Sequence, residues 1–201
     1  PLNLLLERGQ KVAVVGSNGI GKTTLLRSLL GEIKPISGSV ELGGNQLIGY
    51  FEQEIKSDNT NTCIDDVWNE FPSLNQGEVR GLLAKCGLTT DQIESKVYVL
   101  SGGEQAKVRL CKIMNKETNI LVLDEPTNHL DLDSKQILEN VINNYEGTVL
   151  YISHDRYFIN STAKTVLAME KNGVTKYLGN YDFYLEKTKI EEAETETVQT
   201  V

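Results

Sequence analysis

The sequence contains no apolar run near the roughly 20 residues that a membrane-spanning helix needs, and it opens without the basic segment of a secretory signal. It has only three cysteines, Cys63, Cys86 and Cys111, which lie far apart and show no C-x-x-C spacing. Neither a disulfide framework nor a zinc site is therefore indicated. These absences favour a cytoplasmic protein with no stable insertion into a membrane.

Positive charge is also scarce, because 20 lysines and arginines stand against 28 aspartates and glutamates and leave a formal net charge of −8. Non-specific affinity for nucleic acid comes largely from lysine and arginine, so this balance argues against it. Part of the acidity falls in the tail 187–201, which has few apolar residues. We expect this tail either to fray or to begin a solvated helix.

The chain is long enough for one substantial core, and we expect a single domain over residues 1–201. Apolar β-branched runs alternate with helical stretches, which predicts an α/β fold with a mainly parallel sheet flanked by helices. Parallel strands are expected at 11–15, 120–123 and 149–152, and helices at 23–30, 102–114 and 134–145.

Two further patterns interrupt this sheet. Residues 39–42 and 46–51 are expected to be strands joined by a turn at Gly43-Gly44-Asn45, which makes a small antiparallel region, and 166–169 with 174–178 predict a second hairpin. Between about 60 and 99, apolar residues recur at helical spacing, which predicts an inserted α-helical subdomain.

A glycine-rich segment connects the first predicted strand to the first helix, and it reads Gly16-Ser17-Asn18-Gly19-Ile20-Gly21-Lys22-Thr23. Taken alone, such a segment is compatible with a turn that binds nothing, but its position matches the context that a phosphate-binding loop requires. Backbone N–H groups would surround phosphate oxygens, and Lys22 would reach the β- and γ-phosphates. The Thr23 hydroxyl is placed to bind Mg²⁺, and Thr24 can donate to the α-phosphate.

A pair of carboxylates ends the apolar strand 120–123. Asp124 is predicted to hold Mg²⁺, and Glu125 to act as the general base on the attacking water. An apolar strand that ends in two acids is common and more often carries only a solvated acid. The phosphate loop upstream reverses that expectation and favours an ATPase site.

A second anion site is predicted where a serine and two glycines open a helix, at Ser101-Gly102-Gly103-Glu104. An isolated segment of this kind would be an ordinary capped helix. Combined with the phosphate loop and the carboxylate pair, it indicates a site for the γ-phosphate of a nucleotide that another ATPase domain holds.

The chain resembles an ATP-binding-cassette (ABC) ATPase domain over nearly its whole length. The resemblance rests on six motifs in the family's order, namely the phosphate loop, Gln53, Leu100 to Glu104, Leu123 to Pro126, Leu130-Asp131 and Ser153-His154-Asp155. It implies a P-loop NTPase (RecA-like) fold, ATP and Mg²⁺ as cofactors, and ATP hydrolysis. By this resemblance Gln53 contacts Mg²⁺ and the lytic water, Asp131 lies at the nucleotide, and His154 contacts the γ-phosphate. By itself His154 would more often be structural.

The segments 125–131 and 153–158 also resemble the ABC-F subfamily, whose members carry two cassettes and no membrane domain, and many of which act on ribosomes. The chain is similar to the second cassette. The implied partners are a second cassette, in the same polypeptide or in a homodimer, and the ribosome. RNA contacts would then need local basic patches such as Lys164 or Lys171, or the linker between cassettes. The alternative is the ATP-binding subunit of a membrane transporter, which shares the catalytic residues.

One departure from the family concerns the adenine, which cassettes stack on an aromatic residue well upstream of the phosphate loop. The 15 residues before Gly16 contain no aromatic residue. We expect a fragment that lacks the first strand and this contact. Tyr50, Phe51 and Trp68 could be proposed as substitute adenine contacts, but core packing is the expected role of each.

Overall fold

The computed structural model describes residues 4–52 and 58–199, and side chains as far as Ile190. It has a six-stranded sheet in the order β2-β3-β4-β1-β5-β6. All neighbouring strands run parallel except the last pair, β5 and β6. The strands are β1 Lys11–Gly16, β2 Ile48–Phe51, β3 Ile120–Asp124, β4 Thr148–Ile152, β5 Thr165–Glu170 and β6 Gly173–Tyr177. The predicted α/β class, the central strands and the hairpin at 166–178 are confirmed.

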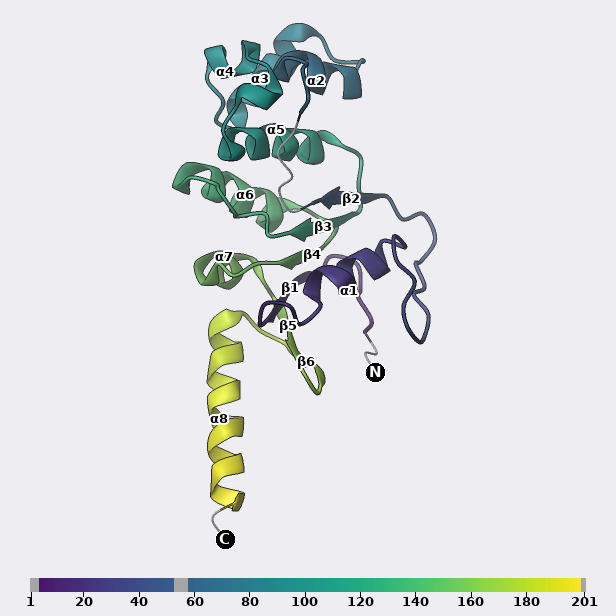
Figure 1. Cartoon of the computed structure of the whole chain (residues 1–201), viewed down its shortest axis with the longest axis vertical. Coiled ribbons are helices and arrows are strands. Elements are labelled where there is room, and N and C mark those ends of the chain that lie inside the picture. Colours follow the sequence, from purple (N-terminus) through teal and green to yellow (C-terminus); the bar gives the residue numbers. More distant parts are fainter. Residues whose placement is uncertain (1–3, 53–57, 200–201) are drawn as a thin grey trace.

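Helices cover both faces of this sheet (Figure 1). Helix α1 packs on one face, where Leu26 joins a core with Val12 and Val14. Helices α5, α6 and α7 supply apolar side chains to the core on the other face. Their bounds are α1 Lys22–Leu29, α5 Gly102–Asn115, α6 Leu132–Asn144 and α7 Arg156–Thr162. The layers explain the apolar central strands, which are buried on both sides.

A group of short helices at one end of the molecule forms a separate core (Figure 1). Its members are α2 Cys63–Glu70, α3 Gln76–Lys85, α4 Thr90–Glu94 and the 3₁₀ turn η1 Val97–Val99. Each of the three α-helices begins at a side chain that accepts a backbone N–H, such as Asn75 at the start of α3. Helix α5 belongs to both cores, because Leu110 packs against the sheet and Cys111 against the helices.

The expected strand at 39–42 is wrong. These residues have no strand partner, and the side chains of Val40 and Leu42 are exposed. A turn does lie at Gly44 and Asn45, but the chain after it joins the parallel sheet through Asn119, whose side chain binds both Asn45 O and Leu47 N. An antiparallel hairpin needs a paired neighbour, and β2 pairs with β3 instead.

The C-terminal helix α8, Tyr181–Gln199, extends away from the sheet at the end opposite the short helices (Figure 1). The acidic tail was expected either to fray or to form a solvated helix, and the structure has a helix there. Within the described ranges 4–52 and 58–199, no helix combines the length and the apolar character needed to cross a bilayer.

Candidate functional site

The predicted phosphate loop and the predicted catalytic residues meet at one edge of the sheet. Strand β4 lies between β1 and β3, and Ile152 pairs with Val14 on one side and with Asp124 on the other. The residues that follow these three strands are therefore neighbours at their carboxyl ends, which is where ligands bind in open α/β sheets.

The loop that leaves β1 is shaped by the close approach of β5. Gly16 has a φ of 150°, and a Cβ at this position would lie 2.6 Å from the carbonyl oxygen of Met169. No other residue fits there without moving β5. The loop then turns into α1 at Gly21, where no side chain caps the helix. The first N–H groups of α1 are thus available to a phosphate, as the sequence predicts.

Lys22 sits inside this loop and is only 7% exposed. Its Nζ donates to the carbonyl oxygens of Gly16 at 2.8 Å and Ser17 at 3.0 Å. These bonds hold the ammonium group among the loop's carbonyls, and an entering phosphate would compete with them for it. The remaining members of the motif, Asn18 to Ile20 and Thr24, reach the surface, and Thr23 is half-buried.

Asp124 is the carboxylate that fits a metal ion. It is almost fully buried, and neither of its oxygens has a hydrogen-bond partner among the described residues. Burial raises the pKa of Asp124, while the nearby Thr23 hydroxyl and the charges of Arg27 and Lys22 lower it in part. A buried carboxylate with free lone pairs beside a threonine hydroxyl is the oxygen donor set that Mg²⁺ takes with nucleotide phosphates.

Glu125 and His154 form a pair at the same edge. Glu125 Oε1 lies 3.3 Å from His154 Nε2, and the Glu125 side chain is largely buried while that of His154 is half exposed. Burial raises the pKa of Glu125, and the neighbouring His154 opposes that shift. The backbone of Glu125 has a φ of 50°, which is uncommon for a residue with a side chain and typical of functional sites.

Two hydroxyls to which the sequence motifs gave no role of their own connect these catalytic segments. Thr127 Oγ1 lies 3.2 Å from Ser153 Oγ in a buried contact, and Ser153 Oγ accepts the N–H of Asp155 at 3.1 Å. The Glu125 N–H donates to Ile152 O at 3.0 Å. The loops that carry Glu125 and His154 are therefore tied together. In the sequence, the available signal for this contact was that both loops directly follow apolar strands.

The second group of predicted residues lines a pocket of about 430 Å³ at the N-terminus of α5. No residue of the phosphate loop lines it; its walls are Gln92, Ser101, Gly102, Gly103, Glu104, Lys107, His129 and Asp131. Ser101 caps the helix by accepting the Glu104 N–H, so its own O–H remains available as a donor.

The two acids in this pocket already have partners. The Glu104 carboxylate accepts the Ser101 N–H at 2.7 Å and the Gln92 amide at 2.6 Å. Asp131 caps α6 by accepting the Ser134 N–H at 2.8 Å. Hydrogen bonds from Ser134 and Lys107 lower the pKa of Asp131 to about 2. Both acids orient helix ends in this structure, and their predicted contacts with a nucleotide remain predictions.

Gln53, the remaining predicted site residue, lies outside the described residues. The three aromatic residues weighed as adenine contacts pack in the interior. Phe51 belongs to the sheet core, Tyr50 packs on the α1 side, and Trp68 donates its indole N–H to Leu74 O at 2.7 Å. Their expected packing role is confirmed.

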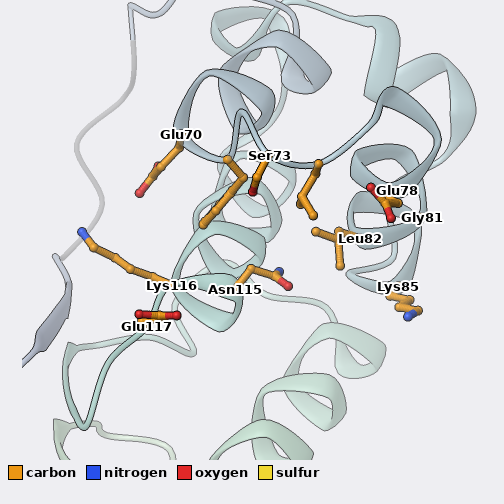
Figure 2. Close-up of a pocket in the computed structure, with 11 residues that line it drawn as sticks. Glu70, Ser73, Glu78, Gly81, Leu82, Lys85, Asn115, Lys116 and Glu117 are labelled. Carbon is orange, nitrogen blue, oxygen red and sulfur yellow. The ribbon is translucent and has the colours of Figure 1, made fainter.

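A larger pocket of about 790 Å³ lies between the short helices and the C-terminal end of α5 (Figure 2). Glu70, Glu78, Lys85, Lys116 and Glu117 line it with mixed charge around the apolar Phe71, Leu74 and Leu82. No predicted site residue belongs to it.

Comparison with known proteins shows the family to which this sequence is similar. The ABC transporter family profile matches residues 1–128. The chain is 65% identical over 158 residues to the uncharacterized ABC transporter ATP-binding protein YfmM of Bacillus subtilis, with 79% of this chain and 30% of that protein covered. It is 45% identical over 188 residues to ABC transporter F family member 5 of Arabidopsis thaliana, with 92% and 27% covered.

Two further matches have names that mention the ribosome. The ribosome protection protein VmlR of Bacillus subtilis is 37% identical over 178 residues, with 89% of this chain and 32% of that protein covered. An archaeal ribosome recycling factor, aABCE1, solved in complex with the ribosomal stalk protein aP1, superposes with a TM-score of 0.69 at 28% identity, with 81% and 32% covered. The chain spans about a third of the length of these relatives. It belongs to the ABC family of ATP-binding domains, and within that family to the ABC-F type.

Proposed function

We propose that this chain binds Mg²⁺-ATP at its own phosphate loop and hydrolyses it only when a second cassette closes head to tail on that nucleotide. The proposal rests on the separation of two anion sites within the chain. The loop, Asp124, Glu125 and His154 share one edge of the sheet, whereas Ser101 to Glu104 open a pocket that no phosphate-loop residue lines. Two anion sites in one chain suit two nucleotides shared by two chains.

The residues of the sheet edge have distinct tasks in this reaction. Lys22 and the first N–H groups of α1 would hold the β- and γ-phosphates. Asp124 and Thr23, with Gln53, would hold Mg²⁺, which neutralises the developing phosphate charge. Glu125 would accept a proton from the attacking water as the oxygen–phosphorus bond forms and the bond to the β-phosphate oxygen breaks. His154, 3.3 Å from Glu125, would orient the γ-phosphate and the water.

The partner cassette would complete the site by presenting its own helix start, the counterpart of Ser101 to Glu104. Here the free Ser101 O–H and the N–H groups at the start of α5 would meet the γ-phosphate. Such donors in a closed, water-poor interface stabilise the transition state strongly. Closure would require ATP, and hydrolysis would release it.

We also propose that the protein carrying this chain acts on the ribosome, as a translation factor or a ribosome protection ATPase in the cytoplasm. The names of VmlR and of aABCE1 support this role. The net charge of −8 requires the RNA contacts to be local. Lys164 and Lys171 are exposed just before β5 and in the β5–β6 turn, and they would serve such contacts.

The ribosomal role predicts nucleotide-dependent co-sedimentation. With a non-hydrolysable ATP analogue, the full-length protein is expected to pellet with ribosomes through a sucrose cushion, because closure holds the binding conformation. With ADP it should stay in the supernatant. Lys22→Ala, which removes the phosphate contact, should remain unbound with either nucleotide. Co-sedimentation with membranes and not with ribosomes would contradict this role and favour the transporter subunit.

A further inference from the structure

A buried lysine one turn into α5 connects the two halves of the ATPase machinery. Lys107 is 9% exposed and lines the pocket at the start of α5. Its Nζ donates to Asp131 Oδ2 at 2.9 Å and to Gly87 O at 3.3 Å. Lysine is rarely buried without a partner, and here the partners are the residue that caps the start of α6 and a residue just after α3. Lys107 belongs to none of the six sequence motifs.

The loop that Lys107 reaches begins at the catalytic acid. From Glu125 the chain turns through Thr127 and His129 to Asp131, where α6 starts. Asp131 uses one oxygen to cap α6 and the other to hold Lys107. The ion pair therefore fixes α5 to the far end of the loop that starts at Glu125.

A second contact joins the same two segments one helical turn away. A Cβ on Gly103 would lie 2.4 Å from the carbonyl oxygen of His129, so the backbone of α5 rests directly on this loop. Gly103 and Lys107 are four residues apart and share one face of the helix. The first two turns of α5 thus have two anchors on the 125–131 loop.

We infer that Lys107 is a positioning residue that holds the Ser101–Glu104 turn, which serves the partner's nucleotide, in register with the loop that carries the chain's own Glu125. The inference rests on the proposed head-to-tail ATPase and names a link between its two sites. Because this link lies within one chain, a displacement of the start of α5 also displaces the loop that carries Glu125. Lys107 itself need touch neither nucleotide.

The test measures kcat, KM and nucleotide affinity in the full-length ATPase for K107M, in which a side chain of similar length lacks the charge. We expect kcat to fall by about tenfold, because a misplaced helix start stabilises the transition state less. The affinity of this cassette for an ATP analogue should change by less than about twofold, because Lys22 and its loop are untouched. Asp131 is largely exposed and stays hydrated, so the variant should fold.

Lys112 offers a matched control on the same helix. Its Nζ pairs with Asp66 at 2.6 Å and with Glu70 at 3.5 Å, which ties α5 to α2 instead of to the 125–131 loop. K112M is expected to lower the melting temperature, because Asp66 is mostly buried, and to keep kcat within about twofold. Lys107→Arg, whose guanidinium can bridge Asp131, should restore kcat to within about threefold of the wild type.

A double variant shows whether Lys107 acts through Asp131. Asp131→Asn keeps a side chain that caps α6 well but removes the charge that Lys107 binds. If the inference holds, K107M with D131N lowers kcat no further than the worse single variant. Multiplied effects of the two substitutions would overturn it.

Other outcomes separate this inference from the proposed function. A wild type that hydrolyses ATP, together with a K107M variant of equal kcat, overturns the inference alone. The inference is also overturned if kcat falls in both K107M and K112M in proportion to the fall in melting temperature. Lys107 would then only stabilise the fold. A wild type that binds no ATP overturns the proposed function and the inference together.

Discussion

The substitution Glu125→Gln is expected to lower ATP turnover by about 10²- to 10⁴-fold, because the amide cannot accept the proton of the attacking water. ATP binding should persist, since Lys22 and the loop around it are unchanged. Single-turnover hydrolysis and equilibrium binding of ATP, measured on the full-length protein, separate the two effects. The variant should also remain on ribosomes with ATP, because closure is no longer released by hydrolysis.

Glu146→Gln is the matched control for this prediction. Glu146 is an exposed glutamate just before β4, at the end of that strand opposite His154. Its substitution should leave turnover within about twofold of the wild type. Turnover by the Glu125 variant above a tenth of the wild-type rate would show that another group takes the proton.

The wild-type pH profile gives a second view of Glu125. Burial raises the pKa of this carboxyl above its ordinary value, and His154 lowers it in part. Only the ionised carboxylate can act as the base. As the pH falls, kcat should therefore begin to drop at a pH above the ordinary glutamate pKa of about 4.3. The acid limb of kcat reports this directly.

The features that could be predicted from the sequence are those whose signal lies within a few consecutive residues. The loop at Gly16 and the acids after β3 were predicted because buried runs ending in glycine or acid are readable in a few residues. Residues 39–42 have the composition of a strand, yet they are exposed. A strand forms only where a neighbour supplies hydrogen bonds, and a single segment carries no record of its neighbour.

The same limit applies to the site. The sequence identified the residue types of both anion sites, but not that Asp131 would be engaged by Lys107, 24 residues away. Nor did it assign the Thr127–Ser153 contact, which joins two loops 26 residues apart. Hydroxyls and lysines are frequent, so their roles emerge only when the fold brings their partners together.

The second large effect is expected from Gly103→Ala. The added methyl would lie 2.4 Å from His129 O, a backbone atom, whereas real contacts of this kind are not shorter than 3.0 Å. The start of α5 must then move by about 0.6 Å, the difference between those two values, or the 125–131 loop must give way. Because the Ser101–Glu104 turn would serve the partner's nucleotide in the proposed reaction, we expect turnover to fall by about 10- to 100-fold. ATP affinity at the chain's own loop should change by less than threefold.

Gly81→Ala provides the control. Gly81 also lies within a helix, α3, but nothing lies within 4 Å of a Cβ built there. Alanine favours a helix over glycine by up to about 1 kcal/mol, so this variant should be as active as the wild type and slightly more stable. Equal turnover in the two alanine variants would show that the contact between α5 and His129 does not matter for hydrolysis.

In the proposed reaction this chain supplies half of each ATP site and needs a partner's α5 to complete it. The most direct measurement is the ATP turnover per molecule of the isolated chain over a wide range of its concentration. We expect very low turnover where the chain is monomeric, with a rise as the concentration increases or a partner cassette is added. Full-rate turnover by the monomer, independent of concentration, would contradict it.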